Sequence, residues 1–273
     1  MVEEERIKAI VVGAAGRMGR TVLKVIQETE GIECAGAVEA VGHEAVGKDA
    51  GEVAGIGRIG VEVADDLSAL IKEADVLIDF TSAASSMYNM ELASFFRKPM
   101  VVGSTGFSPE QRQRIAELTQ NFPCVLSPNM SAGVNLLFRL VETVARALGS
   151  AYDVEILEMH HRGKKDAPSG TAQRLGERVA RALGVELEEV AVYSRSGLVG
   201  ERGQGEIGIM ALRAGDVVGE HTVIFATEGE RIELTHRASS RETFARGAVR
   251  AAKWVVNKEP GLYDMEDVLG LKG

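Results

Sequence analysis

Cysteine is scarce in this sequence, and long apolar runs are missing. The 273 residues include only two cysteines, Cys34 and Cys124, which lie far apart and form no CxxC pair. This spacing favours two structural thiols over a redox or metal role for the cysteines, and we expect no bound metal. No apolar stretch approaches the roughly 20 residues that a membrane-spanning helix needs, which argues against a membrane protein.

An excess of positive charge is missing as well. Lys and Arg total 31 against 40 Asp and Glu, so the formal net charge is −9. Nucleic acids and anionic membranes attract proteins with a basic face, and we therefore expect neither as a partner. The chain opens with acidic residues and enters a strand directly, without the basic start and long apolar stretch of a signal peptide, which predicts a cytoplasmic location.

The first half of the chain alternates short apolar segments with helical patterns. The expected strands lie at residues 7–12, 33–38, 75–80, 99–102 and 123–129. Ser108, Pro109 and Gln111 have the spacing of a capping box at a helix start. This alternation predicts a Rossmann-like, doubly wound parallel α/β sheet, in which ligands bind beyond the carboxyl ends of the strands.

The pattern changes after residue 130. Helices are expected at 132–149 and 171–183, with a strand at 152–160 between them. Longer strands then follow one another directly, at 205–213, 217–226 and 230–238, which is typical of an antiparallel or mixed sheet. We therefore expect an α+β domain at 131–240, inserted into a dinucleotide-binding domain made of 1–130 and 241–273.

A glycine-rich loop follows the first expected strand. The segment GAAGRMG places Gly13, Gly16 and Gly19 at the spacing GxxGxxG rather than the usual GxGxxG. Such glycines let the backbone approach a pyrophosphate, and the following helix N-terminus offers unpaired N–H groups. Arg17 could add a phosphate contact. A tight turn without a ligand is the alternative, which the position after the first strand of an α/β domain disfavours.

Glu39 stands at the end of the second expected strand. A carboxylate here can accept hydrogen bonds from an adenosine ribose, and an ordinary surface glutamate is the alternative. It would repel the 2′-phosphate of NADPH, and the next residue, Ala40, offers no positive charge to hold that phosphate. We therefore expect NADH and/or NADPH as the cofactor, with NADH used at least as well. Arg17, His43 and Lys48 could weaken this preference.

Two polar turns follow later strands of the same sheet. The segments GSTG (103–106) and SPNM (127–130) lie at expected strand ends. In a doubly wound sheet this edge faces the ligand, so the turns would lie toward the nicotinamide. Taken alone, either segment could be an ordinary turn.

The segment EMHHRGKKDAPSGTA (158–172) concentrates positive charge within an acidic chain. Strand alternation puts Glu158 and His160 on one face and His161 on the other, and Lys164 follows four residues after His160. The segment is either a solvated charged loop or a pocket for an anion.

A helix is expected to begin just after these basic residues, near Pro168 or Ser169. Its first N–H groups, around Gly170 and Thr171, have no intrahelical partners. Gly170 lets an anion approach closely, and the Thr171 hydroxyl can donate a hydrogen bond. An ordinary helix cap is the alternative. Next to the basic residues, in a chain with a glycine-rich loop, this start favours a pocket for a small dicarboxylate.

Motifs along essentially the whole chain resemble the 4-hydroxy-tetrahydrodipicolinate reductase family, also called dihydrodipicolinate reductase. In chain order they are GAAGRMGR, IDFT, GSTGF, HHRGKKDAPSGTA, YSRSG, GERGQGEIG, RAGDVVGEHT and THRASSRETFARGAVRAAKW. HHRGKKDAPSGTA is highly specific for that family. Its members often carry Arg directly after the acidic residue of the second strand, and Ala40 departs from this pattern.

The resemblance implies roles for individual residues. His160 would be the proton donor/acceptor and Lys164 the proton donor, while His161, Gly170 and Thr171 would bind the substrate carboxylates. The residues that would hold the cofactor come from the glycine-rich loop, the end of the second strand and the two polar turns: Gly13, Ala14, Ala15, Gly16, Arg17, Met18, Glu39, Gly103, Ser104, Thr105, Ser127, Pro128, Asn129 and Met130. Residues 131–240 would bind the substrate and form a homotetramer.

The reaction implied by the resemblance is an NAD(P)H-dependent reduction in lysine/diaminopimelate biosynthesis. It converts 4-hydroxy-tetrahydrodipicolinate to tetrahydrodipicolinate with loss of water. Another two-domain NAD(P)-dependent dehydrogenase and a non-catalytic dinucleotide sensor are the alternatives. A sugar dehydrogenase would need no anion pocket, and a sensor could dispense with His160 or Lys164.

Overall fold

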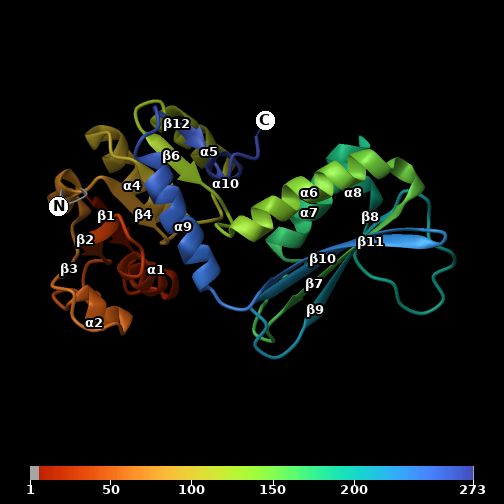
Figure 1. Ribbon diagram of the computed structural model, residues 1–273, viewed down its shortest axis with the longest axis horizontal. Helices are drawn as coiled ribbons and strands as arrows, with labels where there is room; N and C mark the ends of the chain where they lie inside the picture. The colour runs from red at the N-terminus through yellow and green to blue at the C-terminus, as the bar shows by residue number, and fades with distance from the viewer. Residues whose placement is uncertain (1–5, 273) are drawn as a thin grey trace. The chain divides into compact units, whose positions relative to one another are not determined.

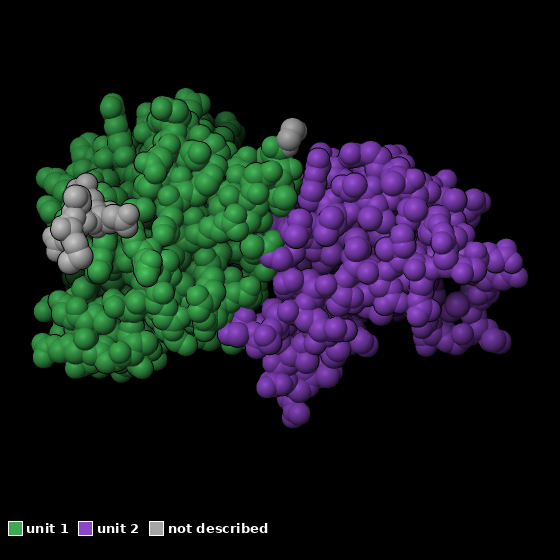
Figure 2. All heavy atoms as spheres, in the orientation of Figure 1, with its two compact units in different colours: residues 1–132, 241–273 green, residues 133–240 purple. Residues whose placement is uncertain are grey.

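The computed structural model describes residues 6–272, which form two compact units (Figures 1 and 2). The first unit comprises the described residues up to Ala132 together with those from Arg241 onward. The second unit comprises Gly133–Ser240. The chain thus leaves the first unit once and returns to it near its end.

The first unit contains a seven-stranded parallel sheet with the strand order β12-β6-β5-β4-β1-β2-β3. Its strands are β1 (Ile7–Val12), β2 (Ile32–Val38), β3 (Val63–Ala64), β4 (Val76–Asp79), β5 (Met100–Val102), β6 (Pro123–Leu126) and β12 (Gly261–Tyr263). In β1, Ala9 and Val11 belong to one core cluster and Ile10 and Val12 to another. The strand is therefore buried on both faces, and the predicted Rossmann-like sheet is confirmed.

Helices supply the partners for both faces of this sheet. One core cluster packs residues of α1 (Arg17–Gln27) and α9 (Glu242–Val255) against the sheet, and the other uses α4 (Ala83–Phe96) and α5 (Pro109–Leu118). Short helices complete the unit: α2 (Ala50–Ala54), α3 (Leu67–Leu70), η1 (Ile71–Glu73) and α10 (Met265–Val268). The apolar stripe of the last long helix does return to the first unit, because α9 contacts α1, β4, β5 and β6.

The second unit has a five-stranded mixed sheet, as the run of consecutive strands predicts. Its strands, in the order β11-β10-β7-β9-β8, are β11 (Glu230–Ala238), β10 (Gly219–Thr227), β7 (Asp153–His160), β9 (Ile207–Arg213) and β8 (Ala191–Val192). Strands β7 and β9 run parallel, whereas β10 pairs antiparallel with both β7 and β11. One face packs against α6 (Ala132–Leu148) and α7 (Gly170–Leu183), and η2 (Gly149–Ala151) and α8 (Leu187–Val190) are short connections (Figure 1).

Several boundaries differ from the sequence expectations. The strand expected over 123–129 ends at Leu126, because the Ser127 hydroxyl donates to the carbonyl of Asn129 and closes a turn. The apolar pattern does not predict α4, since that helix buries the polar Ser86 and Asn89 beside its apolar residues. The strands β3, β8 and β12 have only two or three residues and are too short for a periodic signal.

Candidate functional site

The glycine-rich loop turns sharply between β1 and α1. Gly13 has φ +78°, a conformation that favours glycine, and its N–H donates to the carbonyl of Val38 in β2 at 2.9 Å. Gly16 is the N-cap of α1 and makes no side-chain cap hydrogen bond, and the first turn contains no acidic residue. The helix therefore begins without a side chain that would compete with an anion for its first N–H groups.

Gly19 brings α1 close to this loop. A Cβ at Gly19 would lie 2.1 Å from the carbonyl oxygen of Gly13, so any larger residue would push the helix and the loop apart. Ala14 and Ala15 are buried, while Gly16 and Arg17 are exposed and Met18 is half-buried. Of the predicted loop residues, Gly16 and Arg17 are thus the most accessible to a ligand.

Glu39 contacts the glycine-rich loop directly. Its Oε2 accepts a hydrogen bond from the N–H of Ala15 at 2.9 Å, and its Oε1 accepts one from Ala40 at 3.1 Å. Arg20 donates to the carbonyl of Ala15 at 2.8 Å. The loop and the end of β2 therefore form one hydrogen-bonded surface, which the sequence spacing only suggests.

The ends of β4 and β5 carry a buried polar cluster, of which only Ser104 was predicted as a site residue. The Oδ1 of Asp79 accepts hydrogen bonds from the N–H and hydroxyl of Thr81 at 2.8 and 2.7 Å, and its Oδ2 accepts one from Asn89 at 2.8 Å. Ser86 donates to Ser104 at 2.8 Å. Burial raises the pKa of Asp79 despite these donors. The IDFT motif, which contains Asp79 and Thr81, was the sequence signal that could have indicated this cluster.

The two polar turns lie at successive strand ends. Ser104 is buried in this cluster, Thr105 is exposed, and the ring of Phe80 packs so closely on Gly103 that a Cβ there would lie 2.1 Å from it.

In the later turn, Asn129 accepts from the N–H of Ser131 at 2.9 Å through its side chain and from Ser127 through its carbonyl. Pro128 is exposed. Met130 belongs to the core of the first unit, which limits any contact of its side chain with a cofactor.

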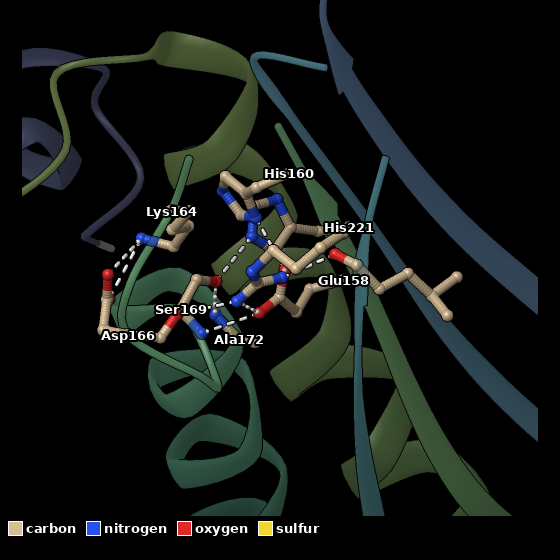
Figure 3. Close-up of polar contacts among 9 residues, drawn as sticks. Glu158, His160, Lys164, Asp166, Ser169, Ala172 and His221 are labelled. Atoms are coloured by element: carbon tan, nitrogen blue, oxygen red, sulfur yellow. Dashed lines mark hydrogen bonds and ion pairs between the residues drawn. The ribbon is translucent and has the colours of Figure 1, made fainter. Parts of the chain in front are cut away.

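Glu158 and His160 meet at the end of β7 in the second unit (Figure 3). The Nδ1 of His160 lies 2.6 Å from Oε2 of Glu158, as expected for two residues on the same face of a strand. The Glu158 side chain has 0% of its surface exposed, and that of His160 has 12%. The strand ends here, and His161 lies just beyond it, with its ring beside Gly163.

Arg213, at the end of the neighbouring strand β9, neutralises Glu158. Its two terminal nitrogens donate to the two oxygens of Glu158 at 2.8 and 2.9 Å, in the bidentate geometry that Arg forms with carboxylates. Burial works against the ionised form of Glu158, but the hydrogen bonds from Arg213, His160 and Ser169 outweigh it, so the pKa of Glu158 lies below its usual value.

Ser169 caps α7 and joins three elements. Its N–H donates to Oε1 of Glu158 at 2.9 Å, and its hydroxyl accepts from the N–H of Ala172 at 3.1 Å (Figure 3). The same hydroxyl lies 3.0 Å from Nε2 of His221 in β10. Gly170 follows, exposed, and a Cβ there would meet nothing within 4 Å. Hydrogen bonds of Ser169 thus fix the start of α7, and the space beside Gly170 is open.

Two histidines in this cluster are held neutral. Burial lowers the pKa of His160, although the Glu158 carboxylate acts in the opposite direction. Burial also lowers the pKa of His221 to about 3, and its ring packs edge-on against that of His160 at a centroid distance of 5.2 Å. Neither Arg213 nor His221 was predicted as a site residue, although the RAGDVVGEHT motif contains both.

Lys164 lies in the loop between β7 and α7. Its Nζ forms an ion pair with both carboxylate oxygens of Asp166 at 3.0 Å, and 20% of its side-chain surface is exposed against 67% for Asp166 (Figure 3). The backbone carbonyl of Asp166 accepts from Arg213 at 2.7 Å. Lys164 is therefore linked, through Asp166, to Arg213, which forms the ion pair with Glu158.

Among residues 6–272, no group of three or more His, Cys, Asp or Glu is placed to hold a metal ion. Across the same residues, no helix combines the length and the apolar character needed to cross a membrane. Cys34 and Cys124 are both free and buried, and burial raises the pKa of Cys34 to about 11, consistent with structural thiols.

Comparison with known proteins gives the same family over both units. The family models "Dihydrodipicolinate reductase, N-terminus" and "Dihydrodipicolinate reductase, C-terminus" match residues 7–130 and 133–269. The former corresponds to the dinucleotide-binding domain.

Two curated relatives are named 4-hydroxy-tetrahydrodipicolinate reductase. The protein from Syntrophus aciditrophicus (strain SB) is 58% identical, covering 97% of this chain and 99% of its own length. The protein from Geotalea daltonii is 55% identical, covering 97% and 100%.

A solved structure also resembles the chain along nearly its whole length. It is the dipicolinate-bound dihydrodipicolinate reductase from Paenisporosarcina sp. TG-14, with a TM-score of 0.75, 25% identity and coverage of 95% of this chain and 97% of that one. An amine dehydrogenase from Mycobacterium smegmatis, 15% identical with a TM-score of 0.61, covers 95% of each chain and shares the fold alone. Given the two family models and the relatives above half identity, this chain belongs to the dihydrodipicolinate reductase family.

Proposed function

We propose that this protein is an NAD(P)H-dependent 4-hydroxy-tetrahydrodipicolinate reductase. It would reduce (2S,4S)-4-hydroxy-2,3,4,5-tetrahydrodipicolinate to 2,3,4,5-tetrahydrodipicolinate with loss of water. The observation that carries the proposal is the hydrogen-bonded pair of His160 and Glu158 beside the open start of α7. Such a pair can exchange a proton, and an open helix start can bind a carboxylate.

The proposed substrate is a small dicarboxylate bound by the second unit. The related solved structure is described as dipicolinate-bound, and dipicolinate carries two carboxylates on one ring. Gly170, with open space where a side chain would be, and Thr171 would receive a carboxylate at the N-terminus of α7. His161, half-buried just past the end of β7, would contribute to the same binding.

His160 and Lys164 would supply the proton chemistry. When hydride reaches C4 of the unsaturated ring, negative charge develops toward the ring nitrogen. A nearby cation and a proton source lower that barrier. Lys164 offers an ammonium group, held by Asp166, and His160 offers a neutral imidazole backed by Glu158.

The first unit is suited to a dinucleotide. The uncapped start of α1 at Gly16, the close approach of Gly19 to Gly13 and the Glu39 carboxylate fit a pyrophosphate and a ribose. A bound nicotinamide cofactor would supply the hydride. The residues proposed to hold it remain those predicted from the loop, Glu39 and the two polar turns. The carboxylate of Glu39 favours NADH over NADPH at this position.

Assembly as a homotetramer is part of the proposal. Leu157 in β7 and Leu212 in β9 are 36% and 50% exposed, and a second copy of the chain could cover them. Light scattering should then give the mass of four chains, and a monomer would contradict this part. Cell fractionation would test the proposed cytoplasmic location.

A single assay tests the activity. Substrate is made freshly by condensing aspartate semialdehyde with pyruvate, and oxidation of NADH and of NADPH is followed by absorbance. Substrate-dependent oxidation and formation of tetrahydrodipicolinate are expected. Cofactor binding without turnover would instead favour a dinucleotide sensor. Turnover of unrelated amino acids or sugars alone would favour a different dehydrogenase.

A further inference from the structure

The carboxylate of Glu158 makes four polar contacts in the cluster at the end of β7. Its carboxylate contacts His160 at 2.6 Å, the N–H of Ser169 at 2.9 Å, and Arg213 at 2.8 and 2.9 Å. It is buried beneath these groups and faces no solvent. The carboxylate thus contacts His160, which we propose exchanges a proton, and Ser169 at the start of α7, where we propose substrate binds.

The charge of Glu158 dictates which nitrogen of His160 carries a proton. An ionised carboxylate can only accept hydrogen bonds, so the Nδ1 of a neutral His160 must carry the hydrogen. The Nε2 is then the unprotonated nitrogen, and it is the atom able to take up and return a proton. Arg213 keeps Glu158 ionised by donating a hydrogen bond to each of its two carboxylate oxygens.

Arg213 is also linked, through Asp166, to Lys164, the second proposed proton donor. Arg213 donates to the carbonyl oxygen of Asp166 at 2.7 Å, and the Asp166 side chain holds Lys164 at 3.0 Å. Glu158, which is buried, contacts His160 directly, and Arg213, whose side chain is 22% exposed, is linked to the loop of Lys164 through Asp166.

We infer that Glu158 is a positioning residue of the proposed reductase: its carboxylate fixes the Nδ1–H tautomer of His160 and presents Nε2 as the proton-exchanging atom. This inference rests on the proposed function, because it assigns a role within that reaction. Glu158 itself touches neither substrate nor cofactor in this assignment.

Several charged or titratable groups face His160 and must be considered together. Glu158 on β7 favours the imidazolium, whereas Arg213 on β9 and Lys164 in the loop disfavour it. His221 on β10 packs against the ring and stays neutral. Glu158 is the one anion in this set, so its neutralisation should lower the pH at which His160 titrates.

The decisive variant is Glu158→Gln, which keeps the size of the side chain and removes its charge. The matched control is Glu155→Gln on the same strand, because Glu155 also pairs with two arginines, Arg195 at 2.9 Å and Arg202 at 3.0 Å, which lie in another ion-pair cluster. Nitrogen-15 NMR of labelled histidines reports the tautomer and titration of His160, with His160→Gln identifying its signals.

In the full-length wild-type protein, neutral His160 should carry its proton on Nδ1. In Glu158→Gln the tautomers should mix, the His160 titration should move to lower pH, and kcat should fall by about 100-fold, the scale of one acid–base group, with KM changed much less. Glu155→Gln should leave the His160 signals and kcat near wild type.

Two outcomes would overturn the inference. An Nε2–H tautomer in the wild-type protein would do so without any variant, which keeps the test decisive if Glu158→Gln fails to fold. A folded Glu158→Gln protein with wild-type tautomer, titration and kcat would do so as well. Absence of reductase activity in the wild type, with the tautomer as expected, would instead reject the proposed function and leave the hydrogen-bond assignment standing.

Discussion

The carboxylate of Glu39 accepts a hydrogen bond from the backbone N–H of Ala15 at 2.9 Å, so the end of β2 and the glycine-rich loop form one surface. A parallel sheet explains this contact, because β1 and β2 are adjacent and end at the same edge. The negative charge of Glu39 therefore stands beside the loop proposed to bind the cofactor phosphates.

Cofactor choice should follow from this charge. We expect kcat/KM with NADH to be at least equal to that with NADPH, and Glu39→Ala to shift the ratio toward NADPH by at least about tenfold, since a like charge near the 2′-phosphate is removed. Glu33→Ala, at the other end of β2, is the control and should leave the ratio unchanged. Steady-state kinetics with both cofactors measures this, and a wild-type preference for NADPH of about 100-fold would contradict it.

Removal of either proposed proton donor should stop turnover without unfolding the protein. His160→Ala and Lys164→Ala should each lower kcat by at least about 100-fold, the usual scale for acid–base groups. Lys165→Ala is the matched control, because Lys165 is the exposed neighbour of Lys164. Circular dichroism verifies the fold. A folded Lys164→Ala variant with near-normal kcat would remove Lys164 from the mechanism.

Gly170 allows binding to be separated from folding. A Cβ at Gly170 would meet no protein atom within 4 Å, so Gly170→Ala should leave the unfolding free energy within about 1 kcal/mol of wild type. If a substrate carboxylate approaches here, the added methyl group should raise KM by about tenfold or more. Denaturant unfolding and steady-state kinetics test the two parts. An unchanged KM would place the carboxylate elsewhere.

His221 should make stability depend on pH. Burial lowers its pKa from 6.5 to about 3, so between these values the unfolded chain binds a proton at this residue that the folded chain does not. Unfolding free energy should therefore fall as pH drops below about 6.5, by up to about 1.4 kcal/mol per pH unit from this group.

The variant His221→Gln removes this contribution. Its unfolding free energy should decline less steeply than that of wild type between pH 6 and pH 4, as measured by urea unfolding at each pH. His43→Gln, at an exposed position, is the control and should follow wild type. Equal slopes for wild type and His221→Gln would show that His221 titrates normally in the folded protein.

Elements defined by local pattern were predictable. The strand β1, the helix α1 and the capping box of Ser108 and Gln111 depend on residues within one or two turns of each other. The helix α4 was not predictable in this way, since its buried Ser86 and Asn89 belong to a polar cluster around Asp79 that forms only in the folded sheet.

The same distinction between local pattern and tertiary contacts applies to the candidate site. By itself the sequence determined which chemical groups are present, and that His160, Lys164 and Gly170 lie within one strand–loop–helix segment, because these relations are local. Only the tertiary structure decided which groups neutralise and orient them. Arg213 is 55 residues from Glu158 along the chain, and the parallel register of β7 and β9, which pairs Arg213 with His160, brings its guanidinium onto the carboxylate. The neutralisation of Glu158 follows from that long-range pairing, because electrostatic interactions depend on distance in space and on burial.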